Sequence, residues 1–195
     1  MQIIGLTGGM AMGKSTAAGF FRRAFLPVFD ADRAVHRLEG RGGRAVAPIG
    51  AAFPGVVRAG RVDRARLRAV VGRDPVALAR LEAILHPLVR AEQARFLARA
   101  RRAGKRAAVL DVPLLFETGG DRRVDRVVVV SAPEAAQRRR LAARGRMSGA
   151  EIATLLARQT ADAERRRRAD VVVRTGLSRH HTARQMRRLV LELLA

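Results

Sequence analysis

A glycine-rich segment near the start of the chain constrains the possible folds more than any other feature. It reads GLTGGMAMGKST over residues 5–16, and Gly8, Gly13, Lys14 and Ser15 fit the pattern G-x-x-x-x-G-K-[ST]. The apolar run QIIGL before it predicts a buried strand, and KSTAAGFFRRAF after it has apolar residues at helical spacing. A strand, a glycine-rich loop and a helix in this order typically bind phosphate, because backbone amides at a helix start attract anions.

Lysine is almost absent from this chain, which makes the lysine of the loop informative. Thirty-seven of the thirty-nine basic residues are arginine, and Lys14 is one of only two lysines. A compact ammonium fits between the β- and γ-phosphates of a nucleotide, whereas a broad, planar guanidinium does not. The Ser15 hydroxyl is the expected Mg²⁺ ligand, because magnesium prefers oxygen ligands. The residues expected to bind the phosphates are Gly9, Ala11, Met12, Gly13, Lys14, Ser15 and Thr16.

Short runs rich in apolar and β-branched residues recur after the loop and predict further strands. They read LPVFDAD, RAAVLDVPLLFE, VDRVVVV and ADVVV. Strands that alternate with helices favour an α/β fold, in which helices cover both faces of a parallel sheet. The segment from about 33 to 105 shows no convincing strand, so we expect it to be a helical, arginine-rich insertion.

Turn and capping residues predict where several helices begin and end. Gly40 closes the first helix of the insertion, and Asp74 followed by Pro75 starts another. Pro87 predicts a break or kink at His86, because proline removes a backbone donor inside the helix. Two capping boxes predict further helix starts, Ser131 with Glu134 and Ser148 with Glu151. The last helix is expected from Ser178, with a buried stripe of Ala183, Met186, Leu189, Val190 and Leu193.

The composition excludes several classes of protein. The 195 residues suffice for one domain, and no apolar run approaches the roughly twenty residues of a membrane-spanning helix. No signal-peptide pattern opens the chain, so we expect a cytoplasmic protein. The absence of cysteine excludes disulfides and thiolate chemistry. A net charge of +22 predicts attraction to polyanions, although a compositional bias toward arginine explains part of it equally well.

The residues beyond the loop bear on the type of phosphate chemistry. A GTPase would need an Asn-Lys-x-Asp element, and the chain has no asparagine. A small-molecule kinase needs a carboxylate near the γ-phosphate, and FDAD supplies Asp30 and Asp32 at the end of the second predicted strand. We expect this strand to end beside the loop, with both carboxylates on one side if the segment stays extended. Alternatively, Asp32 only caps a helix that starts at Arg33.

A series of further segments follows the order and spacing of one enzyme family over nearly the whole chain. The segments are LTGGMAMGKST, VFDAD, GRVDRARL, LEAILHPLV, LDVPLLFE, QRRRLAAR, RQ and RRADVVV. In these the sequence resembles the dephospho-coenzyme A kinases, and the HP and PLLFE elements are more specific than the loop. The resemblance implies transfer of the γ-phosphate of ATP, with Mg²⁺, to the 3′-hydroxyl of dephospho-coenzyme A. This reaction is the last step of coenzyme A synthesis.

The resemblance also implies a fold and its division along the chain. The expected fold is a P-loop kinase core with a five-stranded parallel sheet, an inserted helical lobe that binds the acceptor, and a helical lid. The core would comprise residues 1–32, 106–137 and 169–195. The lobe would span about 33–105 and the lid about 138–168, a segment with ten arginines and three acidic residues.

Several site residues are assigned by matching the family's motifs. Asp32 corresponds to the proposed general base, and Arg140 to an arginine of the lid that acts in catalysis together with Lys14. Arg64 and His86 fall in the acceptor lobe and are expected to bind the substrate. On physical grounds alone His86 is equally well explained as a core residue at a helix break.

Three further positions bear on how the site binds magnesium and nucleotide. Asp111, at the end of a predicted strand, either holds a magnesium-bound water or only contacts solvent. The loop usually has Gly and Ser where Ala11 and Met12 stand here, and alanine is unfavourable if position 11 needs a positive φ. Thr175 stands where the family has an asparagine, so the adenine contact of that loop is in question.

Two alternatives remain open at the level of sequence. A nucleoside or nucleotide kinase would share the same core and differ in its acceptor. An arginine-rich nucleic-acid-binding protein is disfavoured, because aromatic residues make up only 4% of the chain and all of them are phenylalanine. We therefore expect a small-molecule substrate as partner, with no specific nucleic acid and no membrane. The sequence does not show whether the protein is a monomer or an oligomer.

Overall fold

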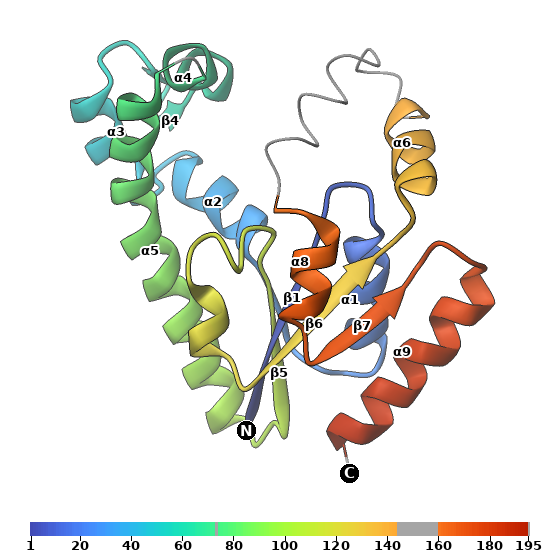
Figure 1. The fold of residues 1–195 in the computed structure, drawn as a ribbon. Helices are drawn as coiled ribbons and strands as arrows, with labels where there is room; N and C mark the ends of the chain where they lie inside the picture. The colour runs from blue at the N-terminus through green and yellow to red at the C-terminus, as the bar shows by residue number, and fades with distance from the viewer. Residues whose placement is uncertain (73, 144–159, 195) are drawn as a thin grey trace. The chain divides into compact units, whose positions relative to one another are not determined.

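The larger of the two sheets has five strands (Figure 1). The computed structural model describes residues 1–72, 74–143 and 160–194. The strands are β1 (Gln2–Gly8), β2 (Val28–Asp30), β5 (Ala107–Asp111), β6 (Arg126–Ser131) and β7 (Val171–Arg174), arranged in the order β2-β5-β1-β6-β7. Strand β1 pairs in parallel with β5 and β6, and β6 pairs in parallel with β7. All the predicted strands are present. The second strand, β2, was expected to end beside the loop, but β5 lies between β2 and β1.

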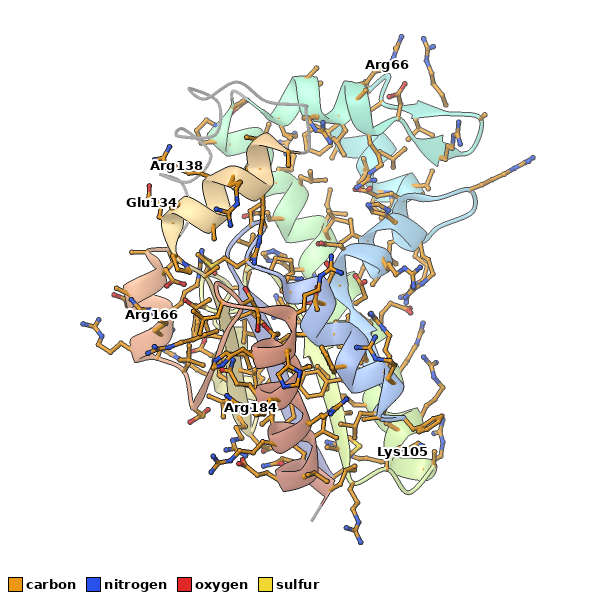
Figure 2. The ribbon with its side chains drawn as sticks, turned by 90° about the vertical axis from the view of Figure 1, so that its right-hand side faces the viewer. Arg66, Lys105, Glu134, Arg138, Arg166 and Arg184 are labelled. Atoms are coloured by element: carbon orange, nitrogen blue, oxygen red, sulfur yellow. The ribbon has the colours of Figure 1, made fainter. Side chains whose placement is uncertain are left out.

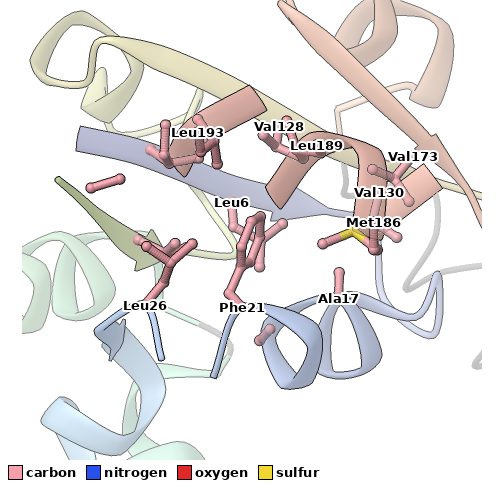
Figure 3. Packing of buried hydrophobic residues seen from close by; sticks show 14 residues of the cluster. Leu6, Ala17, Phe21, Leu26, Val128, Val130, Val173, Met186, Leu189 and Leu193 are labelled. Carbon is pink, nitrogen blue, oxygen red and sulfur yellow. The ribbon is translucent and has the colours of Figure 1, made fainter. Parts of the chain in front are cut away.

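Helices α1 (Lys14–Arg23) and α9 (Arg179–Leu194) pack together on one face of the sheet (Figure 3). Successive side chains of β6 point to opposite faces of the sheet, as side chains along a strand do. Val128 and Val130 pack with α1 and α9, whereas Val129 packs with Leu115 on the opposite face. On the α9 side the predicted stripe is confirmed: Met186, Leu189 and Leu193 are buried, and Ala183 and Val190 are partly buried.

Three further elements complete this part of the chain. They are η1 (Gly120–Arg123), α6 (Glu134–Ala142) and α8 (Asp162–Arg167), and α8 lies against β6. The chain divides into two compact units, and these elements belong to the first, Met1–Phe29 with Ala100–Ala195. The second unit is Asp30–Arg99.

The second unit has a hydrophobic core of its own. Its elements are α2 (Ala31–Glu39), α3 (Val46–Ala52), β3 (Val57–Arg58), β4 (Arg61–Val62), α4 (Arg64–Val71) and most of α5 (Pro75–Arg102). The core is built around the buried side chains Leu38, Ile49, Val56, Val62 and Leu67. Gly40 ends α2 as predicted, and the Asp74 carboxylate accepts from the amides of Val76 and Ala77 to cap α5.

The expectation that this segment lacks strands is wrong. Strands β3 and β4 form a small antiparallel hairpin. Ala59 and Gly60 between them both have positive φ, 48° and 71°, as a tight two-residue hairpin turn requires. Two residues per strand are too few to produce a visible alternation in the sequence.

The expected break at His86 is also absent, since α5 runs unbroken through Pro87. Proline removes one backbone hydrogen bond, but packing on both sides of it keeps the helix continuous. Ile84 and Leu85 before the proline, and Leu88 and Val89 after it, pack against the core of the second unit.

The capping box expected at Ser131 does not form. Helix α6 begins after Pro133, which offers no side-chain cap, and the Ser131 hydroxyl donates instead to Oδ2 of Asp162 at 2.7 Å. The second box, Ser148 with Glu151, and most of the predicted lid lie outside the described residues. At the last helix, the Ser178 hydroxyl accepts from the amide of His181 as expected of a cap.

Charged side chains project from elements of both units, as Arg66, Lys105 and Arg184 illustrate (Figure 2). On α6, exposed Arg138 pairs with Glu134 one turn earlier at 2.7 Å, as expected for a solvated residue (Figure 2). Among the helices that the structure describes, none is long and apolar enough to span a membrane.

Candidate active site

The phosphate loop lies between the end of β1 and the start of α1, and glycine is needed where it meets β6. A methyl group on Gly8 would stand 2.5 Å from the carbonyl oxygen of Val130. Gly13 has a φ of 95°, and a methyl group there would stand 3.3 Å from Oγ1 of Thr175. The two glycines of the sequence pattern thus allow the backbone to approach its neighbours closely.

The start of α1 offers backbone donors that suit an anion. Gly13 is the N-cap and provides no side-chain acceptor. The amides of Lys14 and Ser15, in the first turn, have no acceptor within the helix. The helix dipole adds a partial positive charge at the same point. Ser15 and Thr16 are exposed there, so a phosphate group could reach these donors.

Lys14 meets an acidic residue from the adjacent strand. Its Nζ lies 2.5 Å from Oδ1 of Asp111, and the two side chains are 17% and 6% exposed. Asp111 is the last residue of β5 and stands opposite Leu6 of β1, which places it at the level where the loop begins. The order of strands explains the pair: β5, not β2, is the neighbour of β1, so the carboxylate at the loop comes from Asp111.

Ala11 occupies a turn position that favours glycine. The amide of Met12 donates to the carbonyl of Gly9 at 3.2 Å, closing a four-residue turn whose third residue is Ala11. Ala11 has a φ of 58°, and type II turns need positive φ at this position. The concern raised by the sequence is confirmed, because a Cβ is unfavourable in this region.

Replacing Ala11 by glycine is expected to raise the free energy of unfolding by about 0.5–1 kcal/mol. Glycine adopts this φ without strain, and its greater freedom in the unfolded chain removes part of the gain. Denaturant unfolding measures the change. The control is Ala79→Gly at an exposed position inside α5, where glycine should lower stability by about 1 kcal/mol. A similar loss at position 11 would show that the turn is not strained.

Three side chains remote in sequence donate hydrogen bonds to backbone carbonyls of the loop. Nε2 of Gln137 donates to the Met10 carbonyl, and Nη1 of Arg140 donates to the Ala11 carbonyl. The Thr175 hydroxyl donates to the carbonyl of Met12. Arg140 was predicted from the family resemblance, whereas Gln137 was not identified. Thr175 was noted only as a departure, and no local sequence pattern predicts that either residue contacts the loop.

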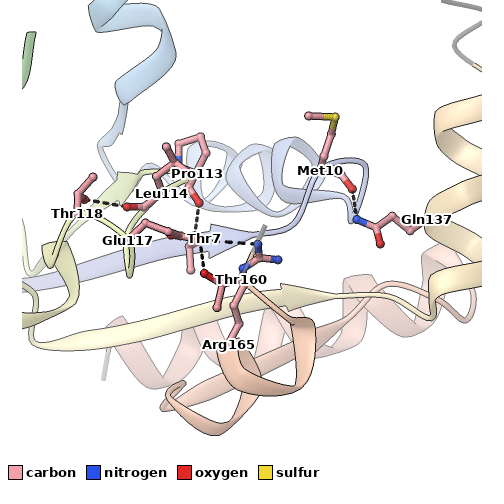
Figure 4. A network of polar contacts seen from close by, with 9 residues as sticks. All are labelled: Thr7, Met10, Pro113, Leu114, Glu117, Thr118, Gln137, Thr160 and Arg165. Carbon is pink, nitrogen blue, oxygen red and sulfur yellow. Dashed lines mark hydrogen bonds and ion pairs between the residues drawn. The ribbon is translucent and has the colours of Figure 1, made fainter. Parts of the chain in front are cut away.

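A buried arginine also lies beside the loop (Figure 4). Arg165 is 3% exposed, and its Nη1 would be 2.8 Å from a methyl group on Gly9. It pairs with Glu117 at 3.9 Å, and Glu117 accepts from the Thr160 hydroxyl. Burial lowers the pKa of the Arg165 guanidinium, while Glu117 and Asp162 act in the opposite direction. Arg165 is the first residue of the run RRRR over 165–168, and the sequence of this run does not distinguish it from its exposed neighbours.

Asp32, Arg64 and His86 all belong to the second unit. Asp30 is the N-cap of α2, and its carboxylate accepts from the amide of Arg33 at 2.9 Å. Asp32 therefore does not cap the helix; it is exposed in the first turn. Arg64 pairs with the buried carboxylate of Glu39 at 2.9 Å, and His86 is half-buried on α5.

The described residues fit magnesium only as a partner of the nucleotide. Among them there is no group of three or more His, Cys, Asp or Glu side chains that would hold a metal alone. The exposed Ser15 hydroxyl and the Asp111 carboxylate are oxygen donors, which magnesium prefers. Most of the remaining ligands would be phosphate oxygens and water, as is usual for nucleotide-bound magnesium.

Comparisons with known proteins assign the chain to a family. The profile of the family described as dephospho-CoA kinase matches residues 2–179. The chain is 55% identical to the dephospho-CoA kinase of Gluconobacter oxydans (strain 621H) over 194 residues, covering 97% of this chain and 96% of that protein.

Solved structures show the same fold. The crystal structure of TT1252 from Thermus thermophilus superposes with a TM-score of 0.87 at 33% identity, covering 100% of this chain and 98% of that one. The dephospho-CoA kinase from Campylobacter jejuni, at 22% identity, superposes with a TM-score of 0.74 and covers 98% and 96%. The expected α/β P-loop kinase fold is confirmed. On these matches, the chain belongs to the dephospho-CoA kinase family.

Proposed function

We propose that the protein transfers the γ-phosphate of ATP to the ribose 3′-hydroxyl of dephospho-CoA, giving CoA and ADP in the cytoplasm. The family match over residues 2–179 carries the assignment. The loop geometry supports it, because the first-turn amides, the Lys14 ammonium and the exposed Ser15 hydroxyl all belong to the start of α1, in the loop that follows β1.

The first unit would bind the nucleotide. The backbone from Gly9 to Thr16 would surround the phosphates, and Lys14 would move its ammonium from Asp111 to the β- and γ-phosphates. Ser15 would coordinate Mg²⁺, which supplies positive charge to the phosphate oxygens when bound. Once Lys14 has moved, the Asp111 carboxylate would accept from a magnesium-bound water. Arg140, anchored beside the loop, would add positive charge as the phosphoryl group moves.

The second unit would bind and activate the acceptor. Asp32, as general base, would take the proton of the 3′-hydroxyl while that oxygen forms a bond to the γ-phosphorus. The bond from the γ-phosphorus to the β–γ bridging oxygen breaks, and ADP leaves with the electron pair. Arg64 and His86 would bind the acceptor, with Arg64 held at the start of α4 by Glu39.

The test is an assay of the purified protein with MgATP and dephospho-CoA. We expect CoA and ADP in equal amounts, identified by mass. Nucleosides, nucleoside monophosphates and other alcohols compete in parallel reactions, so that a nucleoside or nucleotide kinase is distinguished by its preferred acceptor. Folded protein that yields no CoA would contradict the proposal.

A further inference from the structure

We propose that Gln137 and Thr175 are positioning residues, which together with Arg140 fix the orientation of three successive peptide units in the phosphate loop. The inference deepens the proposed function, since it concerns how the same site is prepared for ATP. Each of these side chains donates a hydrogen bond to one of three consecutive carbonyls. The bonds are Gln137 to Met10 at 2.8 Å, Arg140 to Ala11 at 3.2 Å and Thr175 to Met12 at 2.5 Å.

The direction of each carbonyl determines the direction of the next amide. The peptide bonds of the loop are trans, so the C=O of one residue and the N–H of the next point in opposite directions. When Thr175 holds the Met12 carbonyl, the Gly13 amide faces away from Thr175. Gln137 constrains the Ala11 amide in the same way through the Met10 carbonyl. These bonds thus orient donors that an anion in the loop would need.

The central peptide unit explains why such support is needed in this chain. Ala11 adopts a φ of 58°, where alanine is strained, and the Met12 amide is committed to the Gly9 carbonyl. Relaxation of Ala11 to an ordinary conformation would rotate the adjoining peptide units. Arg140 bonds the Ala11 carbonyl itself, while Gln137 and Thr175 hold the units on either side. Bonds on all three carbonyls therefore oppose this relaxation.

The supporting side chains are themselves firmly placed. Gln137 is 5% exposed and Thr175 is 7% exposed, so water competes little for their bonds. Gln137 and Arg140 stand three residues apart on α6 and so share a face of that helix. Arg140 also donates to the hydroxyl and carbonyl of Thr175, and the Thr175 amide donates to the Ser131 carbonyl at the end of β6. The three residues form one connected support built from α6, β6 and the segment after β7.

The test compares Thr175→Val with Thr175→Ser. Valine keeps the shape of threonine and removes the hydroxyl, whereas serine keeps the hydroxyl. We expect Thr175→Val to weaken ADP binding, measured by calorimetry, and to raise KM for ATP, each by about five- to tenfold. The KM for dephospho-CoA should stay unchanged, and Thr175→Ser should bind ADP within about twofold of the wild type. Gln137→Met should weaken ADP binding in the same direction.

A second substitution separates positioning from general stability. Adding Ala11→Gly to Thr175→Val should recover part of the lost ADP affinity, because glycine holds the turn without the hydrogen bond from Thr175. A purely structural role predicts lower stability with no selective effect on nucleotide binding and no such recovery. Unchanged ADP binding in Thr175→Val, or equal impairment in Thr175→Ser, would overturn the inference. ADP binding needs no acceptor, so the result is independent of whether dephospho-CoA is the substrate.

Discussion

Replacement of Lys14 by methionine is expected to lower kcat by about 10²- to 10³-fold, and replacement by arginine should restore little of it. Lys14 is the one side-chain cation of the loop motif, and it contacts Asp111 at the end of β5. Its compact ammonium would fit between the β- and γ-phosphates, which the planar guanidinium of arginine would not reproduce. Steady-state formation of CoA measures the effect.

Thermal unfolding and a matched control distinguish this loss of activity from a loss of folded protein and from a general effect of replacing lysine. Lys14→Arg keeps a positive charge for Asp111, so its thermal unfolding should stay closer to the wild type than that of Lys14→Met. Lys105 is the only other lysine and is exposed between α5 and β5. The control Lys105→Arg should leave kcat unchanged. If Lys14→Arg were as active as the wild type, the ammonium would not be the required group.

The parts of the site that were predictable are local in sequence. The loop motif, the buried strand before it and the helix after it occupy residues 2–23, and the structure confirms all three. The strain at Ala11 could also be predicted from the sequence, because it depends only on the backbone of one turn. Local backbone rules are therefore sufficient to place Gly8, Gly13 and Lys14.

The parts that were not predictable depend on which strands are neighbours. Thr175 lies 163 residues from Met12, and Gln137 lies 127 residues from Met10. Their contacts arise only because β6 lies beside β1 and β7 beside β6. The capping box predicted at Ser131 is absent for a similar reason, because the Ser131 hydroxyl donates to Asp162, which is remote in sequence. Tertiary hydrogen bonds of this kind compete with local ones, and no short sequence window reveals them.

The structure decides which of the two acids of FDAD caps the helix that follows. The sequence allowed Asp32 to be either a base or a helix cap, but the helix starts at Ala31 and Asp30 is its cap. The assumption of an extended segment fails, because Asp32 is already helical. Its exposed carboxylate is not used for capping, so a large effect of its removal would have to come from chemistry.

Asp32→Asn is accordingly expected to lower kcat by at least about 10²-fold, with little change in ATP affinity. Asparagine is nearly isosteric but does not accept the proton of the acceptor hydroxyl. The fold should tolerate the change, because Asp32 is exposed and does not cap α2; its interaction with the helix dipole is worth about 0.3–1 kcal/mol. CoA formation gives kcat, and calorimetry with ATP gives the affinity.

The same substitution at Asp30 tests whether the assignment lies on the correct acid. Asparagine caps a helix as well as aspartate does, so Asp30→Asn should preserve α2 and reduce kcat far less than Asp32→Asn. If the large loss followed Asp30 instead, the general base would be the residue that caps α2. If neither substitution reduced kcat, proton removal by FDAD would be excluded, and the acceptor hydroxyl would lose its proton elsewhere.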